Sequence, residues 1–198
     1  MAQDISTAIL MGGRAQRMGG LRKALFTRNG VSVIERTVSL CDRESTFLVG
    51  NEKAPYLGLG LPIIEDKVIG KGAPGALVTA LLAAKTEWVR VLACDLPCIE
   101  KDTLDGLHPC SKVDVRLYRA DGHPQYLVSL WRSTIGLELL ERVRNDDVSF
   151  KELLGGLRVD WLRADNPAAF YNMNDIESAK ELGYSPQAHL EKKEFETT

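Results

Sequence analysis

The sequence predicts an α/β protein with a mainly parallel, mixed central sheet between layers of helices. Short apolar runs, typical of buried strands, alternate with segments of helical periodicity in the first half of the chain. This alternation is characteristic of βαβ units, in which helices on both faces connect parallel strands. The length of 198 residues fits one domain.

The first half of the chain contains the clearest elements. The predicted strands lie at residues 5–11, 46–50, 88–95 and the start of 61–75. A helix is expected over residues 32–41, where apolar side chains recur at helical spacing. The Ala- and Leu-rich run 75–85, closed by Lys85, is the least ambiguous helix. Together these segments predict a parallel sheet.

The second half is less regular. Its predicted elements are strands at 123–131 and 157–164 and helices at 133–144, 149–156 and 172–183. Residues 185–198 are polar and charged, which predicts a frayed C-terminal tail. We therefore expect a single domain over residues 1–184 and no internal repeat.

Composition and charge narrow the possible partners. The net charge of −2 indicates neither nucleic acid nor an anionic membrane as a partner. Five basic residues nevertheless cluster between Arg14 and Arg28, which favours a small anionic ligand. The four cysteines have no CxxC or zinc spacing, and unpaired thiols fit a reducing cytosol. No signal pattern or membrane span is recognisable, so a cytoplasmic location is expected.

A glycine-rich, cationic stretch, "GGRAQRMGGLRK" at residues 12–23, follows the first predicted strand. It matches neither the Walker A pattern nor GxGxxG. It nevertheless combines backbone N–H groups that glycine lets turn inward with cationic side chains, as phosphate sites do. Arg17 and Lys23 could grip a triphosphate from two sides. The alternative is a connecting loop with solvated basic residues.

Asp95 ends the apolar strand "WVRVLAC". Ligands of open parallel sheets bind outside the carboxyl ends of the strands, where this carboxylate could hold Mg²⁺ against bound phosphates. The alternative is that Asp95 caps a helix near residue 101.

Three further features are more ambiguous. Asn172 and Asn174 precede the last predicted helix, but Asn174 with Glu177 also fits a helix-capping pattern. The loop 65–77, with Asp66 and Gly72, could wrap a base or ribose or could be a plain connector. His123 could be a base, although an isolated histidine is more often a surface residue.

The set of residues favours one type of chemistry. A well-placed carboxylate and a cationic glycine loop, without a recognisable Ser-His-Asp or Cys-His arrangement, suit phosphoryl or nucleotidyl transfer. That chemistry depends on positioning and charge neutralisation.

With these residues in view, the chain resembles the molybdenum cofactor guanylyltransferases of the bacterial MobA family. The family opening, Leu-Ala-Gly-Gly followed by Arg-Met-Gly-Gly and Lys-Ala, is matched by "LMGGRAQRMGGLRKAL". Looser matches are "GAPGAL" at 72–77, "CDLP" at 94–97, "HPQYLVSLW" and "NMNDIES". The likeness extends over residues 8–178 in the same order.

The resemblance implies a three-layer, Rossmann-like nucleotidyltransferase fold and a reaction. A terminal phosphate of a molybdopterin-type cofactor would attack the α-phosphate of GTP, with Mg²⁺ present, and expel pyrophosphate. Lys23 and Arg17 would neutralise the triphosphate, and Asp95 would carry Mg²⁺. The nucleotide would lie near Leu10, Gly12, Gly13, Asp66 and Gly72. The second ligand would lie near Asn174 and Asn172. Cofactor-delivering proteins and acceptor apo-enzymes would be further partners.

The chain also departs from the family pattern. Arg22 stands where the family often has Asp, Met11 replaces Ala, and Asp175-Ile176 replaces Thr-Pro. Two alternatives remain open: a related nucleotidyltransferase that uses CTP or a sugar phosphate, and a non-catalytic GTP-binding protein. A Rossmann oxidoreductase is disfavoured because GxGxxG and its acidic partner are missing.

Overall fold

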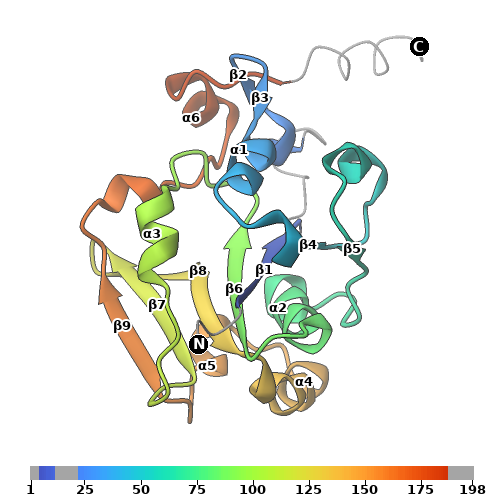
Figure 1. Ribbon diagram of the computed structural model, residues 1–198, viewed down its shortest axis with the longest axis vertical. Helices are drawn as coiled ribbons and strands as arrows, with labels where there is room; N and C mark the ends of the chain where they lie inside the picture. The colour runs from blue at the N-terminus through green and yellow to red at the C-terminus, as the bar shows by residue number, and fades with distance from the viewer. Residues whose placement is uncertain (1–4, 12–21, 187–198) are drawn as a thin grey trace.

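The computed structural model describes residues 5–11 and 22–186, and its centre is a seven-stranded sheet (Figure 1). The strands are β1 (Ile5–Leu10), β4 (Thr46–Val49), β5 (Ile63–Ile64), β6 (Trp88–Ala93), β7 (Val115–Ala120), β8 (His123–Arg132) and β9 (Val159–Arg163). Their order is β5-β4-β1-β6-β8-β7-β9. Strand β8 is antiparallel to both neighbours, and all other pairs are parallel. The predicted mainly parallel, mixed sheet is confirmed.

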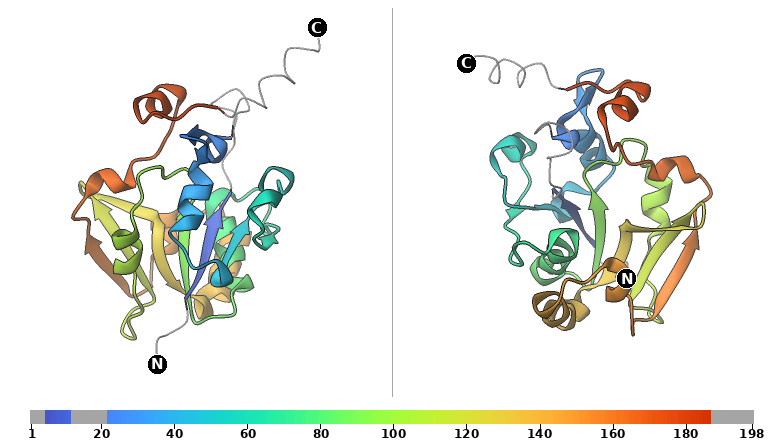
Figure 2. Two further views of the ribbon diagram at one scale, coloured as in Figure 1. Left: turned by 45° about the horizontal axis from the view of Figure 1, so that its top comes forward. Right: turned by 180° about the vertical axis from the view of Figure 1, so that it is seen from behind.

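Helices cover both faces of this sheet (Figures 1 and 2). One face packs against α1 (Val33–Ser39) and α3 (Lys101–Gly106). The other packs against α2 (Gly72–Ala83), α4 (Gly136–Asn145) and α5 (Phe150–Leu153). Short 3-10 segments are η2 (Lys23–Leu25), η3 (Arg43–Ser45), η4 (Ala54–Leu59), η5 (Ser133–Ile135) and η6 (Pro167–Phe170). The predicted three-layer α/β architecture is therefore confirmed.

A small cap lies beyond the carboxyl end of the sheet, at the top of Figure 1. It consists of the hairpin β2 (Thr27–Arg28) and β3 (Val31–Ser32) together with α6 (Ile176–Glu181). Its own apolar cluster comprises Phe26, Val33, Met173, Ala179 and Tyr184. Thr27 and Ser185 exchange two backbone hydrogen bonds of 2.8 and 3.0 Å, which join the hairpin to the segment after α6. Residues 187–198 of the expected tail lie outside the described residues.

Some element boundaries differ from the expected ones for local reasons. Helix α2 begins at Gly72 rather than residue 75, with Pro74 in its first turn, where the missing N–H costs nothing. Helix α6 begins at Ile176 because Asp175 caps it. Strand β7 is not predicted by the sequence pattern. None of the helices within the described ranges is long and apolar enough to cross a membrane.

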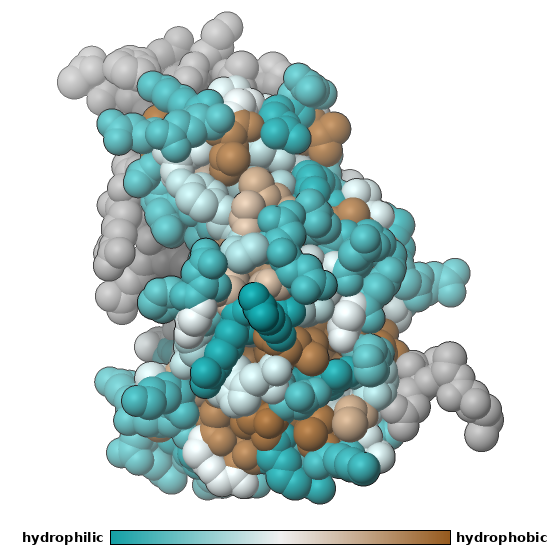
Figure 3. All heavy atoms as spheres, turned by 90° about the vertical axis from the view of Figure 1, so that its left-hand side faces the viewer, coloured by the Kyte–Doolittle hydropathy of each residue, from teal (hydrophilic) through white to brown (hydrophobic). Residues whose placement is uncertain are grey.

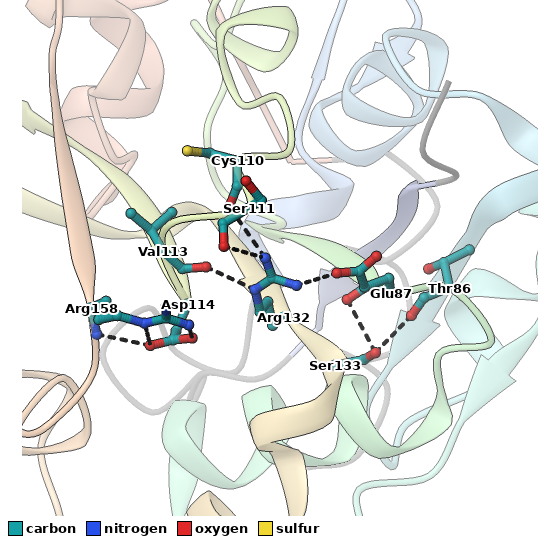
Figure 4. Close-up of polar contacts among 9 residues, drawn as sticks. All are labelled: Thr86, Glu87, Cys110, Ser111, Val113, Asp114, Arg132, Ser133 and Arg158. Atoms are coloured by element: carbon teal, nitrogen blue, oxygen red, sulfur yellow. Dashed lines mark hydrogen bonds and ion pairs between the residues drawn. The ribbon is translucent and has the colours of Figure 1, made fainter. Parts of the chain in front are cut away.

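Arg132, at the end of β8, holds several chain segments together on the side of the sheet away from the cap (Figure 4). Its guanidinium donates to the carbonyl oxygens of Val113 (2.8 Å) and Ser111 (3.0 Å) and pairs with Glu87. It also lies over the ring of Trp88, 4.5 Å from the centroid. The Arg132 side chain is only 16% exposed.

We expect Arg132→Ala to lower the free energy of unfolding by about 3 kcal/mol, because charged hydrogen bonds and aromatic contacts are lost together. Arg158→Ala is the matched control: it also removes a paired arginine (Figure 4), but that side chain is 63% exposed, so the loss of its ion pair with Asp114 should change the stability far less. Urea unfolding of both variants measures the difference. Equal losses of unfolding free energy in the two variants would contradict the stabilising role given to Arg132.

Candidate active site

The candidate active site lies at the carboxyl edge of the sheet, below the cap. Asp95 follows β6, and Lys23 is the first residue of η2. The Lys23 Nζ lies 4.0 Å from the Asp95 Oδ2, and the two side chains are 25% and 28% exposed. Leu10, at the end of β1, pairs with Ala93 of β6 and is buried. A cation and a carboxylate from distant parts of the chain therefore meet where parallel sheets bind ligands.

The surroundings of Asp95 oppose its negative charge. Burial raises the pKa of the Asp95 carboxyl above its usual value, and the nearby Lys23 ammonium partly offsets this. The carboxylate is therefore poorly solvated and gains from any additional cation. The N-cap position of helix α3 is occupied by Glu100, so the alternative interpretation of Asp95 as a helix cap is wrong.

The preceding thiol, Cys94, lies in the same environment. Burial raises its pKa to about 12, and the Asp95 charge adds to the effect. We expect iodoacetamide to alkylate Cys94 at pH 8 about a thousandfold more slowly than a free cysteine of pKa about 8.5, because the thiolate is the nucleophile. The rate should rise about tenfold per pH unit between roughly pH 7 and 9.5. Peptide mass spectrometry measures the alkylation rate of Cys94. A rate that reaches a plateau below about pH 9 would contradict the burial of this thiol.

Residues 171–174 connect η6 to α6 beside Asp95. The Met173 N–H donates to the Asp95 carbonyl oxygen at 3.3 Å. The cap of α6 is Asp175, whose carboxylate accepts from the Ser178 N–H at 2.7 Å; this bond lowers the pKa of Asp175. The capping interpretation of Asn174 is therefore wrong, and its exposed amide is not used as the helix cap.

A cavity of about 250 Å³ lies beside Asp95. Asn172 lines it, together with Gln125, Tyr126 and Phe150. The rings of Tyr126 and Phe150 are stacked, with centroids 5.3 Å apart and planes at 10°. Gln125 and the two aromatic residues are not predicted as site residues by the sequence. The sequence indicates this stack only by the presence of Tyr126 and Phe150 in two separate apolar segments.

Asp66 and Gly72 lie at the other end of the sheet edge. Asp66 follows β5, three strands away from β6, which is about 14 Å at usual strand spacing. Its Oδ1 accepts from the Thr79 hydroxyl (2.8 Å) and the Val68 N–H (2.9 Å), which fixes the loop before α2. Gly75 is needed for this packing, because a Cβ there would lie 2.6 Å from the Val68 carbonyl oxygen. The structure does not bring Asp66 or Gly72 next to Asp95.

Several predicted residues are not placed at the site. Gly12, Gly13 and Arg17 lie outside the described residues. His123 is exposed at the tip of the β7–β8 hairpin. The four cysteines are free and partly buried. No group of three or more His, Cys, Asp or Glu side chains that could hold a metal ion occurs in the part of the chain that the structure describes.

Comparison with known proteins identifies the family. Residues 7–160 match the profile of the MobA-like NTP transferase domain, well over half of the chain. The chain belongs to the MobA-like NTP transferase family. This MobA-like chain is 28% identical over 187 residues to a molybdenum cofactor guanylyltransferase of Serratia proteamaculans, covering 89% of this chain and 93% of the relative. The predicted resemblance is confirmed, and the protein is a nucleotidyltransferase.

Solved structures agree on the MobA-like fold. Molybdopterin-guanine dinucleotide biosynthesis protein A from Archaeoglobus fulgidus superimposes with a TM-score of 0.75 at 20% identity, covering 90% of this chain and 96% of the other. Rv0371c from Mycobacterium tuberculosis, solved in complex with manganese, gives a TM-score of 0.64 at 18% identity, with coverage of 92% and 99%.

Two departures of this MobA-like chain have structural explanations. Arg22, where the family often has Asp, pairs through its Nε with the Glu52 carboxylate at 2.7 Å, so its charge is already matched. Asp175, where the family has Thr, performs the N-capping that both residue types favour. Neither departure removes Lys23 or Asp95.

Proposed function

We propose that this nucleotidyltransferase transfers GMP from GTP to the terminal phosphate of a molybdopterin-type acceptor. A phosphate oxygen of the acceptor forms a bond to the α-phosphorus, the bond from that phosphorus to the bridging oxygen breaks, and pyrophosphate leaves with the electron pair. The product is a guanine dinucleotide form of the cofactor. The observation that carries the proposal is the pair of Lys23 and Asp95 at the carboxyl edge of the sheet, where Asp95 also lines a cavity.

The sheet edge has the right extent for a nucleotide. Asp66 and Gly72 lie at the β5 end and would contact the nucleoside, together with the backbone around Leu10, Gly12 and Gly13. Asp95, which pairs with Lys23, follows β6, and β6 lies three strands, or about 14 Å, from β5, a distance that an extended nucleoside triphosphate can cover. Lys23, and Arg17 with it, would neutralise the charge that develops on the leaving pyrophosphate.

The residues present fit a magnesium ion. Mg²⁺ commonly binds one or two carboxylates together with substrate phosphates, and Asp95 supplies a poorly solvated carboxylate of this kind. Bound there, Mg²⁺ would polarise the α-phosphate and orient it. The Lys23 charge lowers the Asp95 pKa that burial raises, so Lys23 favours the ionised form of this carboxyl.

The acceptor would occupy the cavity beside Asp95. Asn172 supplies an amide at its wall, and Asn174 lies two residues further on, before α6. Gln125 adds a second amide, while Tyr126 and Phe150 supply an apolar side. The amides suit the terminal phosphate of the acceptor, and the apolar side suits the part of the ligand next to that phosphate.

The test is pyrophosphate release from GTP with Mg²⁺, with and without a molybdopterin-type acceptor, and the same assay with CTP and ATP. We expect release that requires the acceptor and is fastest with GTP. Faster release with CTP would replace this proposal by a cytidylyltransferase. GTP binding without release under any condition would favour a binding protein or a different acceptor.

A further inference from the structure

A second cavity, of about 350 Å³, opens at the carboxyl ends of β7 and β9. The tip of the β7–β8 hairpin, Asp121-Gly122, forms one wall, and Trp161 and Arg163 of β9 form another. Figure 3 faces this edge of the molecule and shows hydrophobic side chains lying among strongly hydrophilic ones. The proposed reaction assigns nothing to this cavity.

Trp161 is unusual among the three tryptophans of the chain. Trp88 and Trp131 are fully buried, whereas Trp161 is 38% exposed. The Arg119 guanidinium lies over its ring, 4.1 Å from the centroid, and holds the indole in place. Rigid aromatic surface next to arginine is a frequent basis for binding planar ligands.

The two cavities share the β7–β8 hairpin. Arg119 of the second cavity lies opposite Pro124 of the cavity beside Asp95 in the strand register. Strand β9, which lines the second cavity, lies two strands, or about 10 Å, from β8, which lines the cavity beside Asp95. One elongated ligand could therefore reach both across the hairpin.

We propose that the second cavity binds the ring system of the acceptor, a fused 2-amino-4-oxo pyrimidine such as a pterin, while its phosphate lies beside Asp95. This inference rests on the proposed function. Trp161 stacks on the planar ring. Arg119 and Arg163 donate to the ring carbonyl and ring nitrogen, and the Asp121 carboxylate accepts from the amino group and the ring N–H.

The hairpin supports this assignment of Asp121. Asp121 and Gly122 have positive φ angles of 49° and 80°, the conformation of the two central residues in a tight hairpin turn. The carboxylate is thereby fixed at the tip instead of on a long loop. A carboxylate next to two guanidinium groups offers acceptors and donors side by side, as the edge of such a ring requires.

The test is a titration of the full-length ¹⁵N-labelled protein with 6-hydroxymethylpterin, following the three indole N–H signals by NMR. Trp161→Phe identifies the signal of Trp161. We expect that signal to shift saturably, with little change in those of Trp88 and Trp131. The same titration is repeated with guanosine, which carries the same amino and oxo groups on its pyrimidine ring. If guanosine binds the site more tightly than the pterin, the assignment to the acceptor ring is wrong.

Matched arginine variants locate the binding. Arg119→Met should weaken pterin binding at least about fivefold, the effect of losing one charged hydrogen bond. Arg158→Met, at the other end of β9, should leave it within about twofold. No shift of the Trp161 signal in the wild type, or equal effects of the two variants, would overturn the proposal.

The two proposals can fail separately. If GMP transfer is not observed but the Trp161 signal still saturates with the pterin, the ring site stands and the reaction is wrong. If transfer occurs, Trp161→Ala should raise the KM for the acceptor at least about fivefold and leave that for GTP unchanged. An unchanged acceptor KM would exclude the ring site while leaving the reaction intact.

Discussion

Replacement of Asp95 by asparagine is expected to reduce GMP transfer by about a thousandfold, the size of effect seen when a preorganised electrostatic group is removed. Asparagine has nearly the same shape but lacks the charge that would hold Mg²⁺ and pair with Lys23, which lies 4.0 Å away. Pyrophosphate release at saturating GTP, acceptor and Mg²⁺ measures the effect.

The same variant should be at least as stable as the wild type. The pKa of Asp95 is raised in the folded protein, so the folded state binds the proton more tightly than the unfolded state. The free energy of unfolding therefore falls as the pH rises through the interval between the unfolded and folded pKa values, and it stays lower at neutral pH. The neutral asparagine amide carries no such penalty. Thermal melts at neutral pH should show an equal or higher Tm.

The control for Asp95→Asn is Asp105→Asn, which removes an exposed carboxylate of α3 paired with Lys101. We expect this variant to retain activity within about twofold. If Asp95→Asn keeps a tenth or more of the wild-type activity, Asp95 does not hold a catalytic metal. If it melts well below the wild type, the carboxylate has a structural function and the burial argument is wrong.

Replacement of Lys23 by alanine should lower activity by roughly a hundredfold or more, because the variant would lose the cation that we propose to lie next to the reacting phosphates. The stability should change by less than about 1 kcal/mol, since Lys23 makes one long ion pair in a short 3-10 segment. Comparison of kcat and KM for GTP with urea unfolding separates these effects.

Lys23→Ala should also change the pH profile. Lys23 lowers the pKa of Asp95, so its loss should move the acidic limb of the activity profile to higher pH. Lys101→Ala, which removes a lysine paired with Asp105 on α3, should leave both the activity and the profile unchanged. Global unfolding of Lys23→Ala, or an unshifted acidic limb, would contradict the assignment.

The fold was largely predictable because most strands are apolar runs, which can be recognised without knowing which strands they pair with. Strand β7 is the exception. Arg116, its second residue, is 8% exposed; its guanidinium pairs with the Asp160 carboxylate at 2.8 Å and donates to the His108 carbonyl oxygen at 2.7 Å. An arginine in a short segment argues against a buried strand, and its partner, 44 positions away, cannot be identified from the sequence.

The positions of candidate site residues were predictable where the local sequence decided them. Asp95 could be found because it ends an apolar strand, and Lys23 because it closes a glycine-rich stretch. The stack of Tyr126 on Phe150 could not, because it joins residues 24 positions apart through tertiary packing. The capping of α6 was misassigned by one residue, since Asn174 and Asp175 are both competent caps.

The contribution of late residues to the cap affects the order in which parts of the protein can fold during synthesis. Met173, whose N–H binds the Asp95 carbonyl, and Tyr184, which packs with Phe26 and Val33, come from the last described tenth or so of the chain. During synthesis the sheet can pair completely once β9 has left the ribosome, at residue 163. The cavity beside Asp95 still lacks Asn172 at that moment. The sheet of a nascent chain can thus form before the candidate active site is complete, and premature termination between residues 163 and 172 would remove Asn172 from that site.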